Sequence, residues 1–218
     1  MELEYWQEFY GNLEEQKRLI IPSQFAAFVS NEFSPISDKS VILELGCGSG
    51  RDATLLSQHF AEYVGVDQSK EALERARCLN IAAMQDRQNI NFIDLDLELQ
   101  SSVNTLTSYL EEKGSPIILY TRFFLHAVEP LVEKMVMDLA SKLNCAWVAH
   151  EFRILGDEKN PKVTGAHYRR YLDFSQFKAR VEECGWHISY NVSGYGFAKY
   201  NDDDALVGRV ILRSNESL

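Results

Sequence analysis

The chain has 218 residues, 45% of them hydrophobic, which is enough for one large domain with a sizeable core. Its 22 basic and 32 acidic side chains give a formal net charge of −10, which disfavours RNA, DNA or an anionic membrane as partner. No apolar run approaches the ~20 residues needed to cross a bilayer. The four cysteines lie far apart, at 47, 78, 145 and 184, so we expect reduced side chains in a cytoplasmic protein rather than disulfides or zinc ligands.

Residues 3–30 are predicted to form two helices rich in aromatic side chains. Gly11-Asn12 separates them, and Pro22 and Ser23 mark the entry of the second helix. These aromatic side chains either pack in a core at helical spacing or form a lid over a ligand site. The acidic N-terminus lacks the basic-then-apolar order of a signal peptide.

Residues 41–67 predict a strand, a glycine-rich turn, a helix and a second strand that ends in an acid. The turn is Gly46-Cys47-Gly48-Ser49-Gly50, and Asp67 follows 21 residues after Gly46. Glycines let a ligand approach the backbone closely, and a carboxylate at this spacing can accept hydrogen bonds from both hydroxyls of a ribose. The alternative role for Asp67 is to cap the next helix.

The rest of the chain continues the alternation of strands and helices. The predicted helices are 69–77, with Ser69 as N-cap, 101–112, 129–143 and 174–184, and the strands are 90–94, 117–120, 145–152, 186–193 and 207–213. Residues 153–170 are predicted to be a long polar loop. This order predicts an α/β fold with an open, mostly parallel sheet and helices on both faces.

Two motifs resemble class I (Rossmann-like) S-adenosylmethionine-dependent methyltransferases. They are Glu44-Leu45-Gly46-Cys47-Gly48-Ser49-Gly50 and Gly65-Val66-Asp67, and the resemblance extends over roughly residues 40–155. A dinucleotide fingerprint would read G-x-G-x-x-G, with pyrophosphate on the helix N-terminus. This chain instead has G-x-G-x-G preceded by Glu44, and an acid there suits a ligand with a positive centre and no phosphate.

The resemblance implies a seven-stranded sheet that ends in a C-terminal antiparallel hairpin. It also implies a single domain over 1–218, with an N-terminal helical lid at 1–39, a cofactor-binding core at 40–155, and a substrate loop with the hairpin at 156–218. The implied cofactor is S-adenosylmethionine, and no metal is expected.

Ligands of open α/β sheets bind beyond the carboxyl ends of the strands. The cofactor-binding residues that the resemblance implies are therefore Glu44, Gly46, Cys47, Gly48, Gly50, Arg51, Asp67, Gln68, Asp94, Asp96 and Thr121. Glu44 would lie near the cofactor's amino group and Asp67 at its ribose. Asp94 and Asp96 compete for the adenine amino group, with Asp96 preferred; the alternative for either is a solvated loop acid.

Three side chains that follow the fourth and fifth strands are candidates for catalysis. Arg122 can pair with a carboxylate or phosphate, or instead form a salt bridge to a surface acid. His126 can act as a general base near neutral pH, or only pack at a helix start. Glu151 is expected at the rim, where it would orient the acceptor.

The acceptor is expected to contact two segments. The first supplies Tyr5, Trp6 and Tyr10, and the second supplies His167, Tyr168, Arg169 and Arg170. Two arginines among aromatic rings suit an anion, although a solvated helix entry would have the same composition.

The sequence thus predicts a methyltransferase acting on a small anionic acceptor, by O- or N-methylation of a metabolite or of a sugar- or phosphate-bearing intermediate. The alternatives are a protein or RNA methyltransferase of the same fold, a non-catalytic cofactor-binding subunit and a nicotinamide dehydrogenase. We expect a monomer or homodimer without nucleic-acid or membrane partners.

Overall fold

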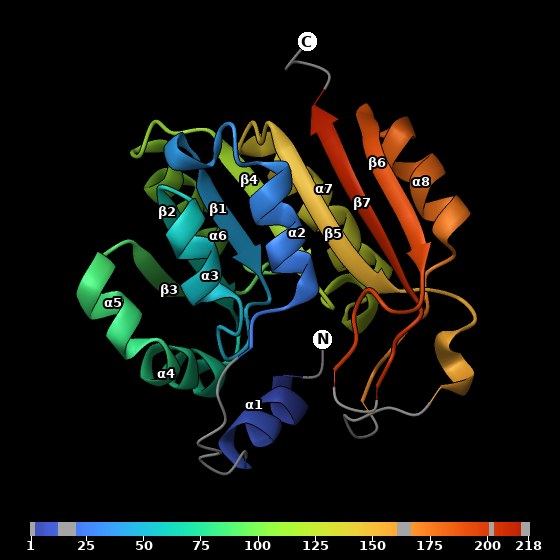
Figure 1. Cartoon of the computed structure of the whole chain (residues 1–218), viewed down its shortest axis with the longest axis horizontal. Coiled ribbons are helices and arrows are strands. Elements are labelled where there is room, and N and C mark those ends of the chain that lie inside the picture. The colour runs from blue at the N-terminus through green and yellow to red at the C-terminus, as the bar shows by residue number, and fades with distance from the viewer. Residues whose placement is uncertain (1–2, 13–20, 161–166, 201–202, 215–218) are drawn as a thin grey trace.

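The computed structural model describes residues 3–12, 21–160, 167–200 and 203–214. Its centre is one seven-stranded sheet in the order β3-β2-β1-β4-β5-β7-β6 (Figure 1). The strands are β1 Val41–Leu45, β2 Glu62–Asp67, β3 Ile90–Asp94, β4 Ile117–Arg122, β5 Trp147–Arg153, β6 Trp186–Gly194 and β7 Val207–Ser214. The first five are parallel, and β7 lies antiparallel between β5 and β6, which confirms the predicted fold and its C-terminal hairpin.

Helices cover both faces of the sheet because its central strands are apolar on both sides. Leu43 of β1 belongs to the core beneath α6, α7 and α8, whereas its neighbour Ile42 packs toward α2, α3 and α4. Full burial of such a side chain contributes roughly 1.5–3 kcal/mol. The helices are α1 Leu3–Asn12, α2 Gln24–Glu32, α3 Ala53–His59, α4 Lys70–Leu79, α5 Ile81–Arg87, α6 Gln100–Glu111, α7 Pro130–Lys142 and α8 Phe174–Glu183.

Two predicted helix starts are confirmed by their caps. The Ser23 hydroxyl accepts a hydrogen bond from the Ala26 N–H at 3.0 Å, and the Ser69 hydroxyl accepts one from Ala72 at 3.2 Å. Helix α5 was not predicted: it is only seven residues long, and none of its residues is fully buried.

The strand order reverses at β1, which pairs with β2 on one side and β4 on the other. Crossovers that diverge from this point leave a crevice at the carboxyl ends of the strands, the usual ligand site of an open α/β sheet. Helix α1 lies at this end of the sheet, next to α4 (Figure 1). Within the described part of the chain, no helix has the length and apolarity required to cross a membrane.

Candidate functional site

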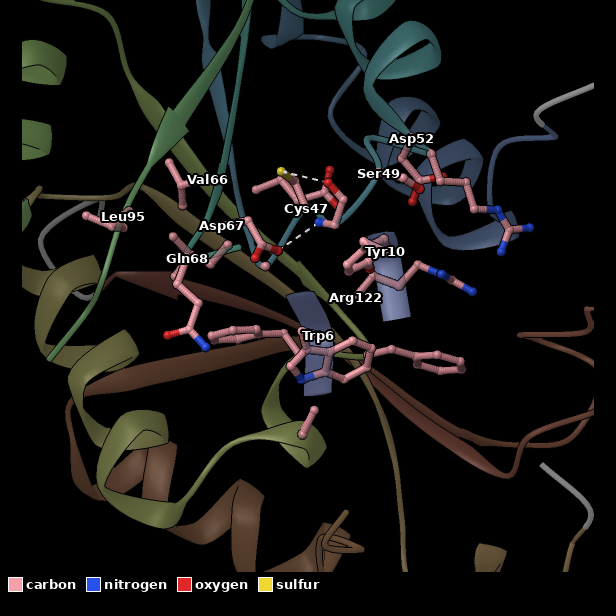
Figure 2. Close-up of a pocket in the computed structure, with 18 of the residues that line it drawn as sticks. Trp6, Tyr10, Cys47, Ser49, Asp52, Val66, Asp67, Gln68, Leu95 and Arg122 are labelled. Atoms are coloured by element: carbon pink, nitrogen blue, oxygen red, sulfur yellow. Dashed lines mark hydrogen bonds between the residues drawn. The ribbon is translucent and has the colours of Figure 1, made fainter. Parts of the chain in front are cut away.

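A cavity of about 360 Å³ lies where the strand order reverses (Figure 2). Its walls come from the glycine-rich turn after β1, the end of β2, the segment after β3, the end of β4 and helix α1. Figure 2 shows Trp6 and Tyr10 of α1 facing Asp67 and Cys47 across this cavity. Among the predicted cofactor residues, those that line it are Glu44, Gly46, Cys47, Gly48, Arg51, Asp67 and Gln68.

The turn after β1 requires glycine at two positions. Gly46 and Gly48 have φ angles of +70° and +52°, which side-chain-bearing residues rarely adopt. A Cβ atom at Gly46 would lie 2.2 Å from the Phe124 ring, and one at Gly48 would lie 2.2 Å from the Tyr10 hydroxyl oxygen. The turn therefore presents bare backbone to the cavity.

The Asp67 carboxylate is held in place by the backbone. The Gly48 N–H donates to Oδ2 at 2.9 Å, and the Ser69 N–H donates to Oδ1 at 2.9 Å. Burial raises the pKa of Asp67, while these backbone hydrogen bonds oppose the rise. A carboxylate has about four lone-pair directions, so Asp67 keeps acceptor capacity for the hydroxyls of a ligand.

Acidic side chains give the cavity a preference for positive charge. Glu44 is buried at the end of β1 and accepts a hydrogen bond from the Tyr63 hydroxyl at 2.6 Å. Burial and then the charge of Asp52 raise the pKa of Glu44 well above its ordinary value. Because Asp52 also lines the cavity, a cationic ligand here would relieve the cost of burying these carboxylates.

The opposite end of the cavity is apolar and carries one polar donor. Val66, Leu95 and Leu97 line it. The Gln68 Nε2 atom is buried and has no hydrogen-bond partner among the residues that the structure describes. These features fit S-adenosylmethionine. Glu44 and Asp52 suit its positive centre, Asp67 suits its ribose hydroxyls, and the apolar end with an unpaired amide donor suits its purine.

Residues 36–109, about a third of the chain, match the model of a family described as a methyltransferase domain. This stretch, residues 36–109, is a methyltransferase domain. This match confirms the resemblance and the enzyme class that the two sequence motifs predicted, and a structural neighbour with bound S-adenosylmethionine supports the predicted cofactor.

Solved structures share the fold of this methyltransferase over nearly the whole chain. A S-adenosylmethionine-dependent methyltransferase from Anabaena variabilis is 18% identical, with a TM-score of 0.69 over 98% of this chain and 93% of that one. Magnesium protoporphyrin IX methyltransferase from Synechocystis, with bound S-adenosylmethionine, is 15% identical, with a TM-score of 0.57 over 95% and 79%. No curated protein matches the sequence.

A second cavity of the methyltransferase, about 190 Å³, adjoins the first. The two cavities share walls formed by Trp6, Arg51, Arg122, Phe123, Ala127 and Tyr200. The remaining lining residues of the second cavity are His126, Arg153, His167, Arg169, Ala198 and Asp203. Its described lining therefore holds four guanidinium groups and a single carboxylate, which favours an anionic occupant.

Arg122 lies at the boundary between the two cavities, and Glu151 fixes its position. The Arg122 Nε atom lies 3.2 Å from Glu151 Oε1, and Arg209 Nε donates to Glu151 Oε2 at 2.7 Å. Burial alone would lower the pKa of Arg122, but the charges of Glu151 and Asp52 raise it above its ordinary value. Glu151 is completely buried, so its expected position at the rim is wrong: it is a buttress for Arg122.

The expected role of His126 as a general base does not fit its hydrogen bonding. Its Nδ1 atom accepts a hydrogen bond from the Arg153 backbone N–H at 3.3 Å. Burial and then the charge of Arg153 lower the pKa of His126 well below its ordinary value, so the ring is neutral. A neutral ring that accepts at Nδ1 carries its proton on Nε2. In this tautomer, assigned from the hydrogen bond, His126 is a donor to the second cavity.

Arg153 was missed by the sequence analysis. It is buried and pairs with Asp157 and Asp203, each at 2.5 Å. Its charge is therefore largely compensated, and it ties the segment around Asp203 to the end of β5.

Four predicted cofactor residues do not line the cavity. Gly50 lies beneath the turn, where its carbonyl accepts from Asn80 Nδ2 at 3.1 Å. Asp94 is exposed and lies 3.8 Å from Lys70 Nζ, and Asp96 accepts from the Glu98 N–H at 2.9 Å. Thr121 points to the other face of the sheet, because side chains alternate along β4, and its hydroxyl lies 2.7 Å from His150 Nδ1.

The predicted acceptor-binding residues divide in the same way. Trp6, Tyr10, His167 and Arg169 line the cavities. Tyr5 packs against His167 with ring centroids 5.0 Å apart, and the Tyr168 hydroxyl donates to Glu129 at 3.1 Å. Arg170 pairs with Glu133 and donates to the Val128 carbonyl at 2.8 Å, so the structure brings none of these three to a cavity wall.

The sequence analysis also missed Phe123, Tyr200 and Asp203. Phe123 directly follows β4, and that position was a usable signal because ligands bind beyond strand ends. Tyr200 and Asp203 belong to the connection between β6 and β7, and no motif marks them.

Proposed function

We propose that this protein transfers a methyl group from S-adenosylmethionine to a small anionic molecule held in the second cavity. The observation that supports this most is the pair Arg51 and Arg122, which line both cavities. Arg51 uses its Nε–H to bind the Ile21 carbonyl at 2.8 Å, and no described carboxylate pairs with it. Burial and then the nearby charge of Arg122 lower the pKa of Arg51, so an anion between the two arginines is favoured.

S-adenosylmethionine, when bound, supplies a methyl group on a positively charged sulfur, and the acceptor supplies the electron pair that displaces the sulfur. The chain's own residues align and desolvate the acceptor. Arg122 binds its acidic group, and the Nε2–H of His126 donates to it. An acceptor oxygen that is already ionised in water needs no general base, in line with a neutral His126.

Helix α1 is proposed to be a lid of the same single domain. Trp6, Phe9 and Tyr10 line the cofactor cavity, and Tyr5 and Trp6 pack against His167 beside the acceptor cavity. The same helix thus borders both ligands. The small size of the second cavity, about 190 Å³, and the acidity of the protein favour a small molecule over a protein or RNA. A cavity beside the cofactor site favours catalysis over a non-catalytic subunit.

Calorimetric titration with S-adenosylmethionine tests the cofactor site. Asp67→Ala removes the proposed acceptor for two ribose hydroxyls, and hydrogen bonds to a charged group contribute roughly 1.5–3 kcal/mol each, so we expect at least ~100-fold weaker binding. Asp94→Ala, an acid outside the cavity, should bind like the unmodified protein. Full binding by Asp67→Ala, or none by the unmodified protein, would refute the site.

A methyl-transfer assay with labelled S-adenosylmethionine and a panel of small carboxylates, phosphates and neutral or cationic amines tests the acceptor class. We expect turnover with anionic members. Turnover confined to amines without an acidic group would contradict the proposal.

A further inference from the structure

The second cavity has an unusual composition of apolar side chains. Those that line it are aromatic, Trp6, Phe123 and Tyr200, or are the small residues Ala127 and Ala198. In the described lining there is no leucine, isoleucine, valine or methionine. The three rings come from α1, the end of β4 and the β6–β7 connection, so they converge from distant parts of the chain.

Each of the three rings lies beside a guanidinium or imidazole group. The Arg51 guanidinium carbon lies 4.6 Å from the centre of the Tyr200 ring, and that of Arg122 lies 4.6 Å from the Phe123 ring. Trp6 packs on His167 with ring centroids 4.8 Å apart. Cation–π and ring contacts of this kind hold the aromatic faces in fixed positions before any ligand arrives.

The backbone of Phe123 adopts a strained conformation that brings its ring to the junction of the cavities. Its φ angle is +56°, an outlier for a bulky residue, and its N–H donates to the Glu151 carbonyl at 2.8 Å. Such strain persists where surrounding structure enforces it, and it concentrates at functional sites. Phe123 lines both cavities, so it borders the space between cofactor and acceptor.

Arg122 still has hydrogen-bonding capacity for an acidic group. Glu151 faces only its Nε side, at ion-pair distance without a hydrogen bond, and neither Nη atom donates a hydrogen bond to a described residue. A guanidinium with free Nη atoms binds a carboxylate with well-defined direction.

We infer that the acceptor is a planar aromatic acid, with its ring against Trp6, Phe123 and Tyr200 and its acidic group on Arg122. This inference rests on the proposed function for the location of the acceptor and adds the requirement for a flat ring. An aliphatic acid of the same size would satisfy Arg122 but would lose the ring–ring contacts, which are mainly edge contacts at Phe123 and Tyr200, where guanidinium groups lie over the ring faces.

The test is a calorimetric titration of the protein saturated with S-adenosylhomocysteine, with benzoate, cyclohexanecarboxylate and phosphate as probes. Benzoate should bind roughly 10-fold more tightly than cyclohexanecarboxylate, since two aromatic contacts add about that factor. Equal affinities for the two carboxylates, tighter binding of phosphate, or no binding of benzoate would each overturn the inference. Failure of S-adenosylhomocysteine to bind would instead refute the proposed cofactor site.

Matched variants test which rings produce the preference for benzoate over cyclohexanecarboxylate. Phe123→Leu and Tyr200→Leu keep apolar volume but remove the flat face, so the benzoate preference should fall toward 1. Tyr195→Leu alters an exposed tyrosine of the same connection that lines neither cavity, and should retain the preference. A preference that survives both Phe123→Leu and Tyr200→Leu would also overturn the inference.

Discussion

Arg122 and Glu151 face each other in register on β4 and β5, with Nε 3.2 Å from Oε1. Glu151 is in turn the register partner of Arg209 on β7, which donates to its other oxygen at 2.7 Å. The three side chains form a buried row of alternating charge at the cavity end of the sheet. This row keeps Arg122 charged and fixed, with its Nη atoms toward the ligands.

Glu151→Gln should destabilise the fold and weaken acceptor binding. The change leaves two buried arginines without their shared carboxylate, and breaking a buried pair costs on the order of 3 kcal/mol. Urea unfolding measures this loss, and KM for an acidic acceptor should rise more than kcat falls, because Arg122 loses its position rather than its charge. Glu111→Gln, on the exposed side of α6, should change neither. Unchanged stability and KM in Glu151→Gln would remove the buttress role.

Gly48→Ala should weaken cofactor binding and displace α1. The new Cβ would lie 2.2 Å from the Tyr10 hydroxyl, and a left-handed alanine costs roughly 1–2 kcal/mol. We expect at least a ~10-fold loss of affinity for S-adenosylhomocysteine by calorimetry. In the double variant with Tyr10→Phe, part of the affinity should return, because the clash with the hydroxyl is removed. If the hydroxyl is not the obstacle, the affinity losses of the two single variants should simply add. Gly11→Ala, with open space around its Cβ, should bind normally.

Phe123→Gly should be more stable than Phe123→Ala, the reverse of the usual order. Both variants lose the ring, but only alanine is strained at a φ angle of +56°. We therefore expect the free energies of unfolding in urea to differ by about 1 kcal/mol. At the neighbouring Phe124, where φ is −93°, alanine should be the more stable of the two. An alanine variant at 123 that matches or exceeds glycine would show that no strain is stored there.

The stability of the protein should depend on His150 below neutral pH. Burial lowers the pKa of His150 to about 3, so the unfolded state binds a proton that the folded state does not. Stability from this residue is complete above the ordinary pKa near 6.5 and is lost as the pH falls toward 3. Between pH 7 and pH 5 the unmodified protein should lose about 2 kcal/mol relative to His150→Gln, measured by urea unfolding. From pH 8 to pH 7 the free energies of unfolding of the two proteins should change in parallel. If they still change in parallel down to pH 5, His150 is not buried in its neutral form.

Much of the fold and the cofactor half of the site followed from local sequence pattern. Apolar runs predicted the strands, and Ser23 and Ser69 predicted their helices because capping depends on neighbouring residues alone. Helix α5 was missed because it is short and has no fully buried residue. Thr121 was misplaced because the sequence does not say which face of β4 is turned toward the ligand.

The acceptor half depended on charge pairing across the sheet. Arg153 and Arg170 are compensated by acids from distant segments, whereas Arg122 keeps its Nη atoms free. From the sequence, Arg122 and Arg170 were both predicted to be site residues, Arg153 was not, and Glu151 was expected at the rim. Strand register alone determines that Glu151 lies between Arg122 and Arg209.

The sequence by itself determined the turn from Gly46 to Gly50 and its distance to Asp67, since backbone geometry over a short stretch dictates both. The second cavity, by contrast, could be found only in the folded protein. Its rings at Trp6, Phe123 and Tyr200 lie far apart in the chain, and their meeting depends on the packing of α1 and of the β6–β7 connection over the same end of the sheet. Such contacts are set by long-range packing and charge compensation, which leave no periodic signal in the sequence.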